Sequence, residues 1–251
     1  MNPRFSIITI TYNAEPVLEV TIQSVLTQTY DAIEYIIVDG NSTDKTLSVV
    51  DKYKTRINKV ISEPDRGIYD AMNKGIKEAT GDYLIFLNAG DTFKESETLS
   101  RVVKLIFDSD KYKQTFHLPD IIYGETAIVD KERRFLHMRR LSAPDRLDWK
   151  SFKKGMLVCH QSFWVRRELI EPYNLTYRFS SDFEWSIRML KKANSVYNTH
   201  LILINYLKEG TTTQNHKTSL KERFLIMGKY YGWTSTILNH YWFIIRLFIK
   251  S

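Results

Sequence analysis

Three aspartates each follow an apolar, strand-like run in the first part of the chain. Asp39 ends the segment YIIVD, Asp65 lies in the turn SEPDRG, and Asp91 ends LIFLNAGD. Parallel strands end at one edge of a sheet, where open α/β folds bind ligands, so the three carboxylates are expected to project into one crevice. Neighbouring negative charges cost stability unless a cation or hydrogen-bond donors offset them. A nucleotide supplies such donors through its base and ribose, and Mg²⁺ or Mn²⁺ supplies the cation.

Each aspartate by itself also fits an ordinary turn. Asp39 would cap a turn made tight by Gly40 and Asn41, and Asp65 would start a turn after Pro64. The sequence Asn-Ala-Gly-Asp is a common surface turn. The occurrence of all three after successive strands favours a ligand site over three unrelated turns.

The elements that would position these aspartates alternate between strands and helices. The strand candidates before residue 90 are Phe5–Ile10, Glu34–Val38, Lys59–Ile61 and Tyr83–Leu87. Helices are predicted between them at Val17–Leu26, from a start near Ser42 capped by Ser42 or Thr43, and at Ile68–Ala79. This alternation indicates right-handed βαβ units and a parallel sheet, so the predicted fold class is α/β.

The pattern loosens after Asp91. The expected elements are a helix at Glu97–Asp108, a strand at Asp120–Tyr123, a hairpin or strand at Ala127–Met138 and a loop at 142–156. From about Leu220 the tail has a helical pattern that is rich in aromatic residues. We place a soft boundary near residue 130.

The length and the cysteine content limit the class of protein. A chain of 251 residues suits one large α/β domain. The single cysteine, Cys159, excludes an internal disulfide, and the six histidines lack the spacing of a zinc site. The segment MNPRFSIITI is interpreted as a first strand, and no apolar stretch approaches the roughly 20 residues that cross a bilayer. These features predict a reducing, cytoplasmic location.

The net charge of +7 is divided unevenly along the chain. Residues 1–129 carry 14 Lys and Arg against 19 Asp and Glu, a balance of −5, whereas residues 130–251 carry 22 against 10, a balance of +12. A basic half suggests anionic partners such as lipid head groups, diphosphates or nucleic acid, although basic faces also occur without any partner. Nucleic acid is disfavoured, because the aromatic residues fall in apolar runs instead of alternating with Lys and Arg.

Four segments carry a resemblance to a known family. In order and spacing, FSIITITYN, IEYIIVDGNSTDKT, SEPDRGIYDAMNKGI and ATGDYLIFLNAGDTF resemble the nucleotide-sugar-binding half of inverting glycosyltransferases of family 2, including bacterial polysaccharide-biosynthesis enzymes. The resemblance implies the GT-A fold, a Rossmann-like, mostly parallel sheet flanked by helices, with a smaller acceptor-side region and C-terminal helices. It divides the chain into a nucleotide-sugar-binding half (1–129), an acceptor-side half of the same domain (130–219) and a basic, aromatic helical tail (220–251).

The resemblance implies a set of donor-binding residues at the strand ends: Thr11, Tyr12, Asp39, Asp65, Arg66, Asn88, Ala89, Gly90 and Asp91. Thr11 and Tyr12 would lie beside the base, and Asp39 would accept a hydrogen bond from a base N–H. Asp65 would lie close to the nucleoside. Arg66 would pair with a phosphate, or would be a solvated turn arginine.

The turn from Asn88 to Asp91 corresponds to the DXD metal motif of the family. Asp91 is therefore the expected ligand of a divalent metal, Mg²⁺ or Mn²⁺. Asn88 stands where an aspartate is typical and brings no charge, although it can still hydrogen-bond a ribose hydroxyl. Metal affinity is therefore expected to rest mainly on Asp91 and on the donor diphosphate.

The acceptor side needs a base, because a sugar hydroxyl is a poor nucleophile until a carboxylate accepts its proton. By resemblance, Asp182 in RFSSDFEWSIRML occupies the position of the catalytic base. The other expected acceptor-side residues are His160, Gln161, Glu184 and Trp185. The alternative for Asp182 and Glu184 is a helix N-terminus capped by Ser180 or Ser181, and His160 could be structural. Trp164 and Trp185 could stack on a sugar ring or lie in the core.

The predicted function is transfer of a sugar, with inversion, from a nucleoside-diphosphate donor to a saccharide or polyprenyl-linked glycan, with UDP as the expected nucleotide. The alternative is a nucleotide-sugar-binding protein without turnover, because of the change at Asn88. The tail LNHYWFIIRLFIK suggests an interfacial helix on the anionic inner face of the cell membrane. A packing helix or a dimer contact would also explain it.

Overall fold

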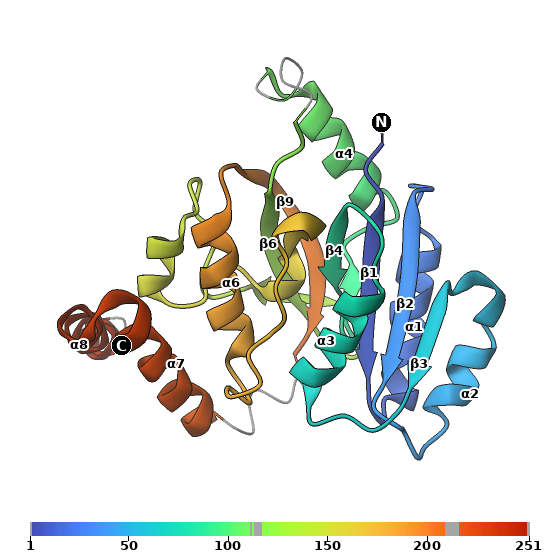
Figure 1. The fold of residues 1–251 in the computed structure, drawn as a ribbon, viewed down its shortest axis with the longest axis horizontal. Helices are drawn as coiled ribbons and strands as arrows, with labels where there is room; N and C mark the ends of the chain where they lie inside the picture. The colour runs from blue at the N-terminus through green and yellow to red at the C-terminus, as the bar shows by residue number, and fades with distance from the viewer. Residues whose placement is uncertain (1, 111, 113–116, 209–215, 250–251) are drawn as a thin grey trace.

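The computed structural model describes residues 2–110, 112, 117–208 and 216–249. Within these residues the strands form one sheet, whose strands lie side by side in Figure 1. In spatial order its strands are β3 (Lys59–Ser62), β2 (Ile33–Asp39), β1 (Phe5–Thr11), β4 (Tyr83–Phe86), β8 (Phe163–Arg166), β6 (Ile121–Val129), β9 (Val196–Leu207) and β5 (Thr92–Phe93), and β7 (Phe135–Met138) pairs with β6.

The predicted parallel sheet is confirmed in the first half of the chain. Strand β1 pairs in parallel with both β2 and β4, and β2 pairs in parallel with β3. The second half mixes directions, because β8 runs antiparallel to its neighbours β4 and β6, whereas β6 and β9 are parallel. One sheet therefore continues through both halves, and the proposed boundary near residue 130 falls in the turn between β6 and β7.

Helices cover both faces of the sheet. The helices on one face are α1 (Glu15–Leu26), α2 (Thr46–Asp51) and α4 (Thr98–Asp108), and those on the other are α3 (Ile68–Glu78), α6 (Ser181–Lys192) and α7 (His216–Tyr231). In Figure 1, α3 and α6 lie in front of the sheet and α1 lies behind it. Ile8 and Ile36 face the first of the two core clusters and Ile7 and Ile37 face the second, as the alternation of side chains along a strand requires. The sheet is thus buried on both faces.

Helix α3 packs unusually close to the sheet. A Cβ atom on Gly75 would lie 2.4 Å from Cγ2 of Ile8 and 3.5 Å from Cγ2 of Val38. The absence of a side chain at Gly75 therefore lets the helix backbone approach β1 and β2. The same helix begins at Ile68, directly after the turn that contains Asp65.

Two sequence predictions of local structure need correction. Helix α2 begins at Thr46, not near Ser42, because the Ser42 hydroxyl is committed to the carboxylate of Asp39 and Thr43 binds the side chain of Asn13. The expected loop at 142–156 contains the 3₁₀ turn η2 (Trp149–Lys154), which is closed by a capping box between Asp148 and Ser151. Other 3₁₀ turns are η1 (Lys54–Arg56), η3 (His160–Ser162) and η4 (Arg167–Leu169).

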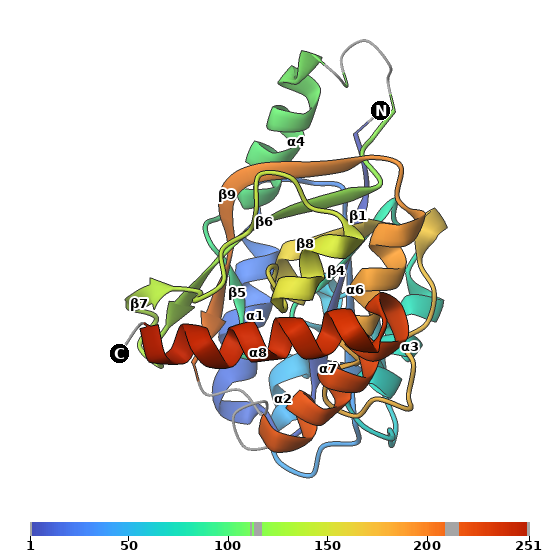
Figure 2. The same ribbon diagram turned by 90° about the vertical axis from the view of Figure 1, so that its left-hand side faces the viewer.

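The C-terminal tail forms two helices, α7 and α8 (Trp233–Ile249), joined at Gly232 with φ of +80°. Figure 2 shows α8 lying lengthwise across one side of the molecule, beside α7. Among the described residues, none of the helices has the length and apolar content needed to span a bilayer. The side chains from Trp242 to Lys250, which dominate the predicted interfacial tail, lie outside the described residues.

Candidate functional site

The strand ends of β1 and β2 bring the first group of predicted residues together. Asp39 is fully buried and pairs in register with Thr11. Its carboxylate accepts hydrogen bonds from the Ser42 N–H at 3.0 Å, from the Ser42 hydroxyl and from Ser62 Oγ at 2.8 Å. The Thr11 hydroxyl is buried and has no hydrogen-bond partner in the described part of the chain. Asp39 is thus held in place by serines, and an unpaired hydroxyl lies at the neighbouring strand end.

Asp65 and Tyr12 meet at Gly40. A Cβ atom at this glycine would lie 2.5 Å from Asp65 Oδ2 and 3.3 Å from Cδ2 of Tyr12. The Asp65 carboxylate also accepts a hydrogen bond from the N–H of Gly67 at 2.8 Å, so it is part of a turn as well as of this cluster. The Tyr12 ring is 62% exposed and is available to a flat ligand such as a base. A side chain at position 40 would therefore displace the Asp65 carboxylate from its place beside Tyr12.

Arg66 points away from this cluster. Its side chain is 79% exposed and forms an ion pair with Asp70 at 3.4 Å, one helical turn along the chain. In the structure, Arg66 is therefore a solvent-exposed arginine of the turn. Its pairing with a phosphate stays a prediction.

The turn after β4 lies next to the end of β1, because the N–H of Ala89 donates to the carbonyl of Ile10 at 3.1 Å. Gly90 has φ of +98°, a value that favours glycine, and its N–H donates to Thr21 Oγ1 at 2.9 Å. Asn88 Nδ2 lies 3.3 Å from Nε2 of His160. Asn88 Oδ1 is buried and has no hydrogen-bond partner among the described residues.

Asp91 is enclosed by protein. It is 4% exposed, and its carboxylate accepts hydrogen bonds from Gln161 Nε2 at 2.6 Å and from the Leu207 N–H at 2.9 Å. Burial raises the pKa of Asp91 to about 7, although these two hydrogen bonds and the charge of Arg133 act in the opposite direction. The expectation that Asp91 projects into an open crevice beside Asp39 and Asp65 is therefore corrected.

His160 joins the donor-side turn to Asp182. Its Nδ1 lies 3.6 Å from Asp182 Oδ2, while its Nε2 faces Asn88. Because the Asn88 amide nitrogen is a donor, Nε2 accepts and the ring proton lies on Nδ1, toward Asp182. Burial lowers the pKa of His160, and the charge of Asp182 opposes this shift. The neutral form of His160 is thus favoured.

Asp182 stands in the first turn of α6. Its Oδ1 accepts hydrogen bonds from the Tyr69 hydroxyl at 2.9 Å and from the Phe183 N–H at 2.9 Å. The predicted alternative, a serine cap at this helix start, is not seen, because the Ser180 hydroxyl binds Ser219 instead. The carboxylate is held by donors from two elements and faces His160.

The prediction that Glu184 and Trp185 lie on the acceptor side is wrong, because both side chains are buried in packing contacts. Glu184 is 1% exposed and binds Arg188 at 2.8 Å and the hydroxyl of Tyr230, so it connects α6 to α7. Trp185 is fully buried and stacks on Tyr173 with ring centroids 4.9 Å apart. The Glu184 side chain points from α6 toward α7, and the Trp185 side chain points toward the core.

Trp164 is also a core residue, and it helps to fix the position of Gln161. It is fully buried, and its indole N–H donates to the carbonyl of Gln161 at 2.9 Å. The thiol of Cys159 donates to Gln161 Oε1 at 2.6 Å. Gln161 is therefore fixed at both ends, with its amide N–H directed at Asp91, instead of lining an acceptor site.

Two residues at the site were missed in the sequence. Tyr69, within the quoted segment SEPDRGIYDAMNKGI, donates to Asp182. Arg133, in the β6–β7 turn with φ of +65°, donates to the carbonyl of Gly90. The signal available for Arg133 was the cluster of basic residues in the predicted hairpin.

The turn from Asn88 to Asp91 offers only part of a ligand set for a divalent cation, and its Asp91 carboxylate is enclosed by protein. Asn88 Oδ1 has no hydrogen-bond partner in the described part of the chain, and each Asp91 oxygen keeps a lone pair beyond the hydrogen bond that it accepts. Within the described ranges, no group of three or more His, Cys, Asp or Glu could hold a metal. The protein by itself therefore offers too few ligands for a closed metal cage.

Comparisons with known proteins point to one family. The family model for glycosyl transferase family 2 matches residues 6–173. The chain is 35% identical over 216 residues to a PGL/p-HBAD biosynthesis glycosyltransferase of Mycobacterium bovis, covering 83% of this chain and 78% of that protein. It is 27% identical over 219 residues to the putative teichuronic acid biosynthesis glycosyltransferase TuaG of Bacillus subtilis, covering 86% and 83%.

Solved structures share the fold. S. aureus TarS in complex with UDP superimposes with a TM-score of 0.68 at 18% identity, over 90% of this chain and 65% of that chain. A mannosyltransferase of Pyrobaculum calidifontis in complex with GDP-Man and Mn²⁺ gives a TM-score of 0.62 at 15% identity, over 95% and 74%. The fold is that of GT-A glycosyltransferases, a mixed sheet flanked by helices. With a family model across two thirds of its length and a relative above 30% identity, the chain belongs to glycosyl transferase family 2.

Proposed function

We propose that this glycosyltransferase transfers a sugar, with inversion, from a nucleoside-diphosphate donor to a hydroxyl of a saccharide or lipid-linked glycan. The observation that carries the proposal is the chain of contacts from Asn88 through His160 to Asp182. It places a carboxylate beside the turn that follows the donor-side strands. A base and a donor-side turn in such proximity suit attack of an acceptor hydroxyl on a bound sugar.

The nucleoside is assigned to the cluster of Asp39, Asp65 and Tyr12. Asp39 would accept a hydrogen bond from the base, Tyr12 would lie against the ring, and the unpaired hydroxyl of Thr11 would contact the same moiety. UDP is the proposed nucleotide, since a neighbour with this fold binds UDP.

The diphosphate is assigned to the turn from Asn88 to Asp91. Asn88 Oδ1 and the Asp91 carboxylate would hold Mg²⁺ or Mn²⁺, which neutralises charge on a departing diphosphate. The guanidinium of Arg133 adds positive charge behind Gly90.

Asp182 is the proposed base. The acceptor hydroxyl gives its proton to Asp182 while its oxygen bonds to the anomeric carbon. The bond from that carbon to the diphosphate oxygen breaks on the opposite side, and the electron pair leaves with the diphosphate. His160 and Tyr69 hold the Asp182 carboxylate in position for this step.

The alternative is a protein that binds nucleotide sugars without turnover. It is favoured by Asn88, which supplies no charge where the family motif has an aspartate. Measured transfer or donor hydrolysis by the wild-type chain would exclude it.

Replacing Asp182 by Asn tests the proposed base. Transfer should fall by about 10²- to 10⁴-fold, the contribution of general-base catalysis, while the stabilisation by UDP is retained. The matched control is Asp145→Asn, an acid with a 94% exposed side chain, which should leave both unchanged. Full turnover by Asp182→Asn would refute the assignment of the base.

The acceptor is proposed to be a polyprenyl-linked glycan at the inner face of the cell membrane. The relatives in PGL/p-HBAD and teichuronic acid biosynthesis support a glycan or glycolipid product. A soluble saccharide acceptor used as efficiently as a lipid-linked one would argue against this part.

A further inference from the structure

Helix α8 exposes a row of large apolar side chains to solvent. Trp233, Ile237, Leu238 and Tyr241 are 53%, 57%, 65% and 66% exposed and recur at helical spacing. We call these four residues the α8 stripe. The opposite side of the helix is attached to the protein, since Thr236 is fully buried. The Trp233 ring also packs on α7, against Phe224 and over Gly228, so the side chains left mainly in water are those of Ile237, Leu238 and Tyr241. Large apolar side chains exposed together on one helix indicate an interaction surface.

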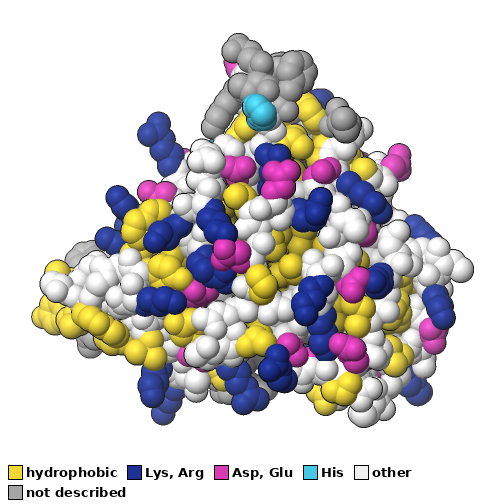
Figure 3. All heavy atoms as spheres, in the orientation of Figure 1, with side chains coloured by type: hydrophobic (Ala, Val, Ile, Leu, Met, Phe, Trp, Pro, Cys, Tyr) yellow, Lys and Arg dark blue, Asp and Glu magenta, His cyan; other side chains and the backbone are white. Residues whose placement is uncertain are grey.

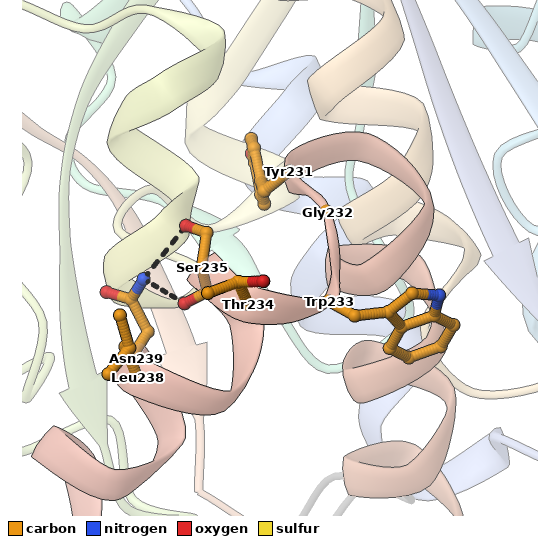
Figure 4. Close-up of a pocket in the computed structure, with 7 residues that line it drawn as sticks. All are labelled: Tyr231, Gly232, Trp233, Thr234, Ser235, Leu238 and Asn239. Atoms are coloured by element: carbon orange, nitrogen blue, oxygen red, sulfur yellow. Dashed lines mark hydrogen bonds between the residues drawn. The ribbon is translucent and has the colours of Figure 1, made fainter.

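A shallow hollow joins the α8 stripe to the start of the helix. It has a volume of about 530 Å³ and is lined by residues that include Tyr231, Trp233 and Leu238. Figure 4 shows Trp233 and Tyr231 on either side of the Gly232 link, with Leu238 one turn further along. The hollow thus connects Tyr231 to the exposed apolar side chains.

Lysines surround Tyr231 and its aromatic neighbours. Trp149 stacks on Tyr231 with ring centroids 5.6 Å apart and an interplanar angle of 11°. The ammonium groups within 6 Å of the rings of Trp149, Tyr230 or Tyr231 belong to Lys150, Lys153, Lys191 and Lys229, which we call the lysine cluster. In Figure 3, hydrophobic side chains gather at the α7–α8 end of the molecule with Lys and Arg beside them.

Among the residues that the structure describes, Lys150, Lys153 and Lys191 of the lysine cluster form no ion pair, and Lys229 forms a long one. The acid next to Lys229 is Glu184, 4.0 Å away, and its carboxylate already binds Arg188 at 2.8 Å. Asp148, beside η2, is bound by the N–H and hydroxyl of Ser151. The cluster lies in residues 130–251, where 22 Lys and Arg and 10 Asp and Glu give a net charge of +12.

We propose that the α8 stripe and the lysine cluster dock this protein on an anionic membrane surface. The stripe would enter the boundary between head groups and acyl chains, and the lysines would contact anionic head groups. Tyr and Trp suit this boundary, since each has an apolar body and a polar tip. A second copy of the chain is disfavoured as the occupant, because pairing this face with itself would bring two lysine clusters together.

Co-sedimentation of the full chain with vesicles tests the proposal without donor or acceptor, so its outcome is separate from that of the transfer reaction. The vesicles are phosphatidylglycerol–phosphatidylcholine mixtures and pure phosphatidylcholine. We expect binding to the anionic vesicles that weakens as salt is raised, and much weaker binding to the neutral ones.

Two variants separate the contribution of the lysine cluster to vesicle binding from that of the α8 stripe. Lys150→Gln/Lys153→Gln/Lys229→Gln should bind the anionic vesicles on the order of 100-fold more weakly, since each lysine near such a surface contributes about 1 kcal/mol. The matched control, Lys52→Gln/Lys59→Gln/Lys77→Gln, removes the same charge from exposed sites on the first half and should bind as wild type does. Ile237→Ser/Leu238→Ser should weaken binding at every salt concentration.

Two results would overturn the proposal. One is equal binding of the wild type and the lysine variant to anionic vesicles. The other is an absence of vesicle binding together with self-association that Ile237→Ser/Leu238→Ser abolishes, which would assign the face to a second copy. All of these substitutions are at the surface, and circular dichroism checks that each variant is folded.

Discussion

The carboxylate of Asp91 has a structural role in addition to its proposed place near the diphosphate. Its two hydrogen-bond donors come from residues 70 and 116 positions away in the chain. It thereby ties the donor-side turn to the η3 turn and to the end of β9. A buried group with partners on two distant segments should affect stability strongly.

Replacing Asp91 by Asn should destabilise the fold in a pH-dependent way. The amide nitrogen would face the N–H groups of Gln161 or Leu207 and leave a buried donor unpaired, at a cost of about 1–3 kcal/mol. Burial raises the pKa of the wild-type carboxyl to about 7 in the folded state, well above that of an aspartate in the unfolded chain, so the folded state keeps a proton that the unfolded state releases. The stability advantage of the wild type over Asp91→Asn should therefore fall as pH rises through this window, and level off above pH 7.

Urea unfolding at pH 5, 6, 7 and 8 measures this difference. Asp44→Asn is the control, because hydrogen bonds from Thr46 lower the pKa of Asp44 and its contribution should be constant over this range. A difference between wild type and Asp91→Asn that is constant, or that grows with pH, would contradict the prediction.

At the scale of elements, the close approach of α3 to the sheet positions Tyr69 against Asp182. Gly75→Ala should destabilise the protein by about 1–3 kcal/mol, the usual cost of overpacking, because the new methyl would overlap Cγ2 of Ile8. Thermal or urea unfolding measures the loss. Lys77→Ala, an exposed change on the same helix, should stay within about 0.5 kcal/mol of wild type. Equal stability of the two variants would mean that α3 can shift without cost.

At the scale of the whole molecule, donor binding should couple the two halves. A nucleoside-diphosphate sugar at 100 times its dissociation constant should raise the free energy of unfolding by about 2.7 kcal/mol. Chelating Mn²⁺ with EDTA should reduce this effect for the diphosphate donor but not for the free nucleoside, which lacks the metal-binding phosphates. A thermal-shift series with UDP-, GDP- and dTDP-sugars makes the measurement. If none of these donors stabilises the protein, the proposed nucleotide site is wrong.

The local elements and the family were accessible from the sequence. The first four strands were predicted to within one or two residues, because apolar runs and turn residues are local signals. The start of α2 was misplaced, since Ser42 looks like a cap but is bound to Asp39 across the turn. The mixed strand directions of the second half were also not predicted, because pairing between distant strands has no local signal.

The sequence by itself determined that aspartates follow successive strands and that Asp182 opens a helix. Only the tertiary structure decided which way those side chains face. Asp182 faces His160, whereas Glu184, two residues further along α6, points into the contact with α7. The physical reason is that helical periodicity defines which residues share a face, but the partner that covers each face comes from segments far away in the chain.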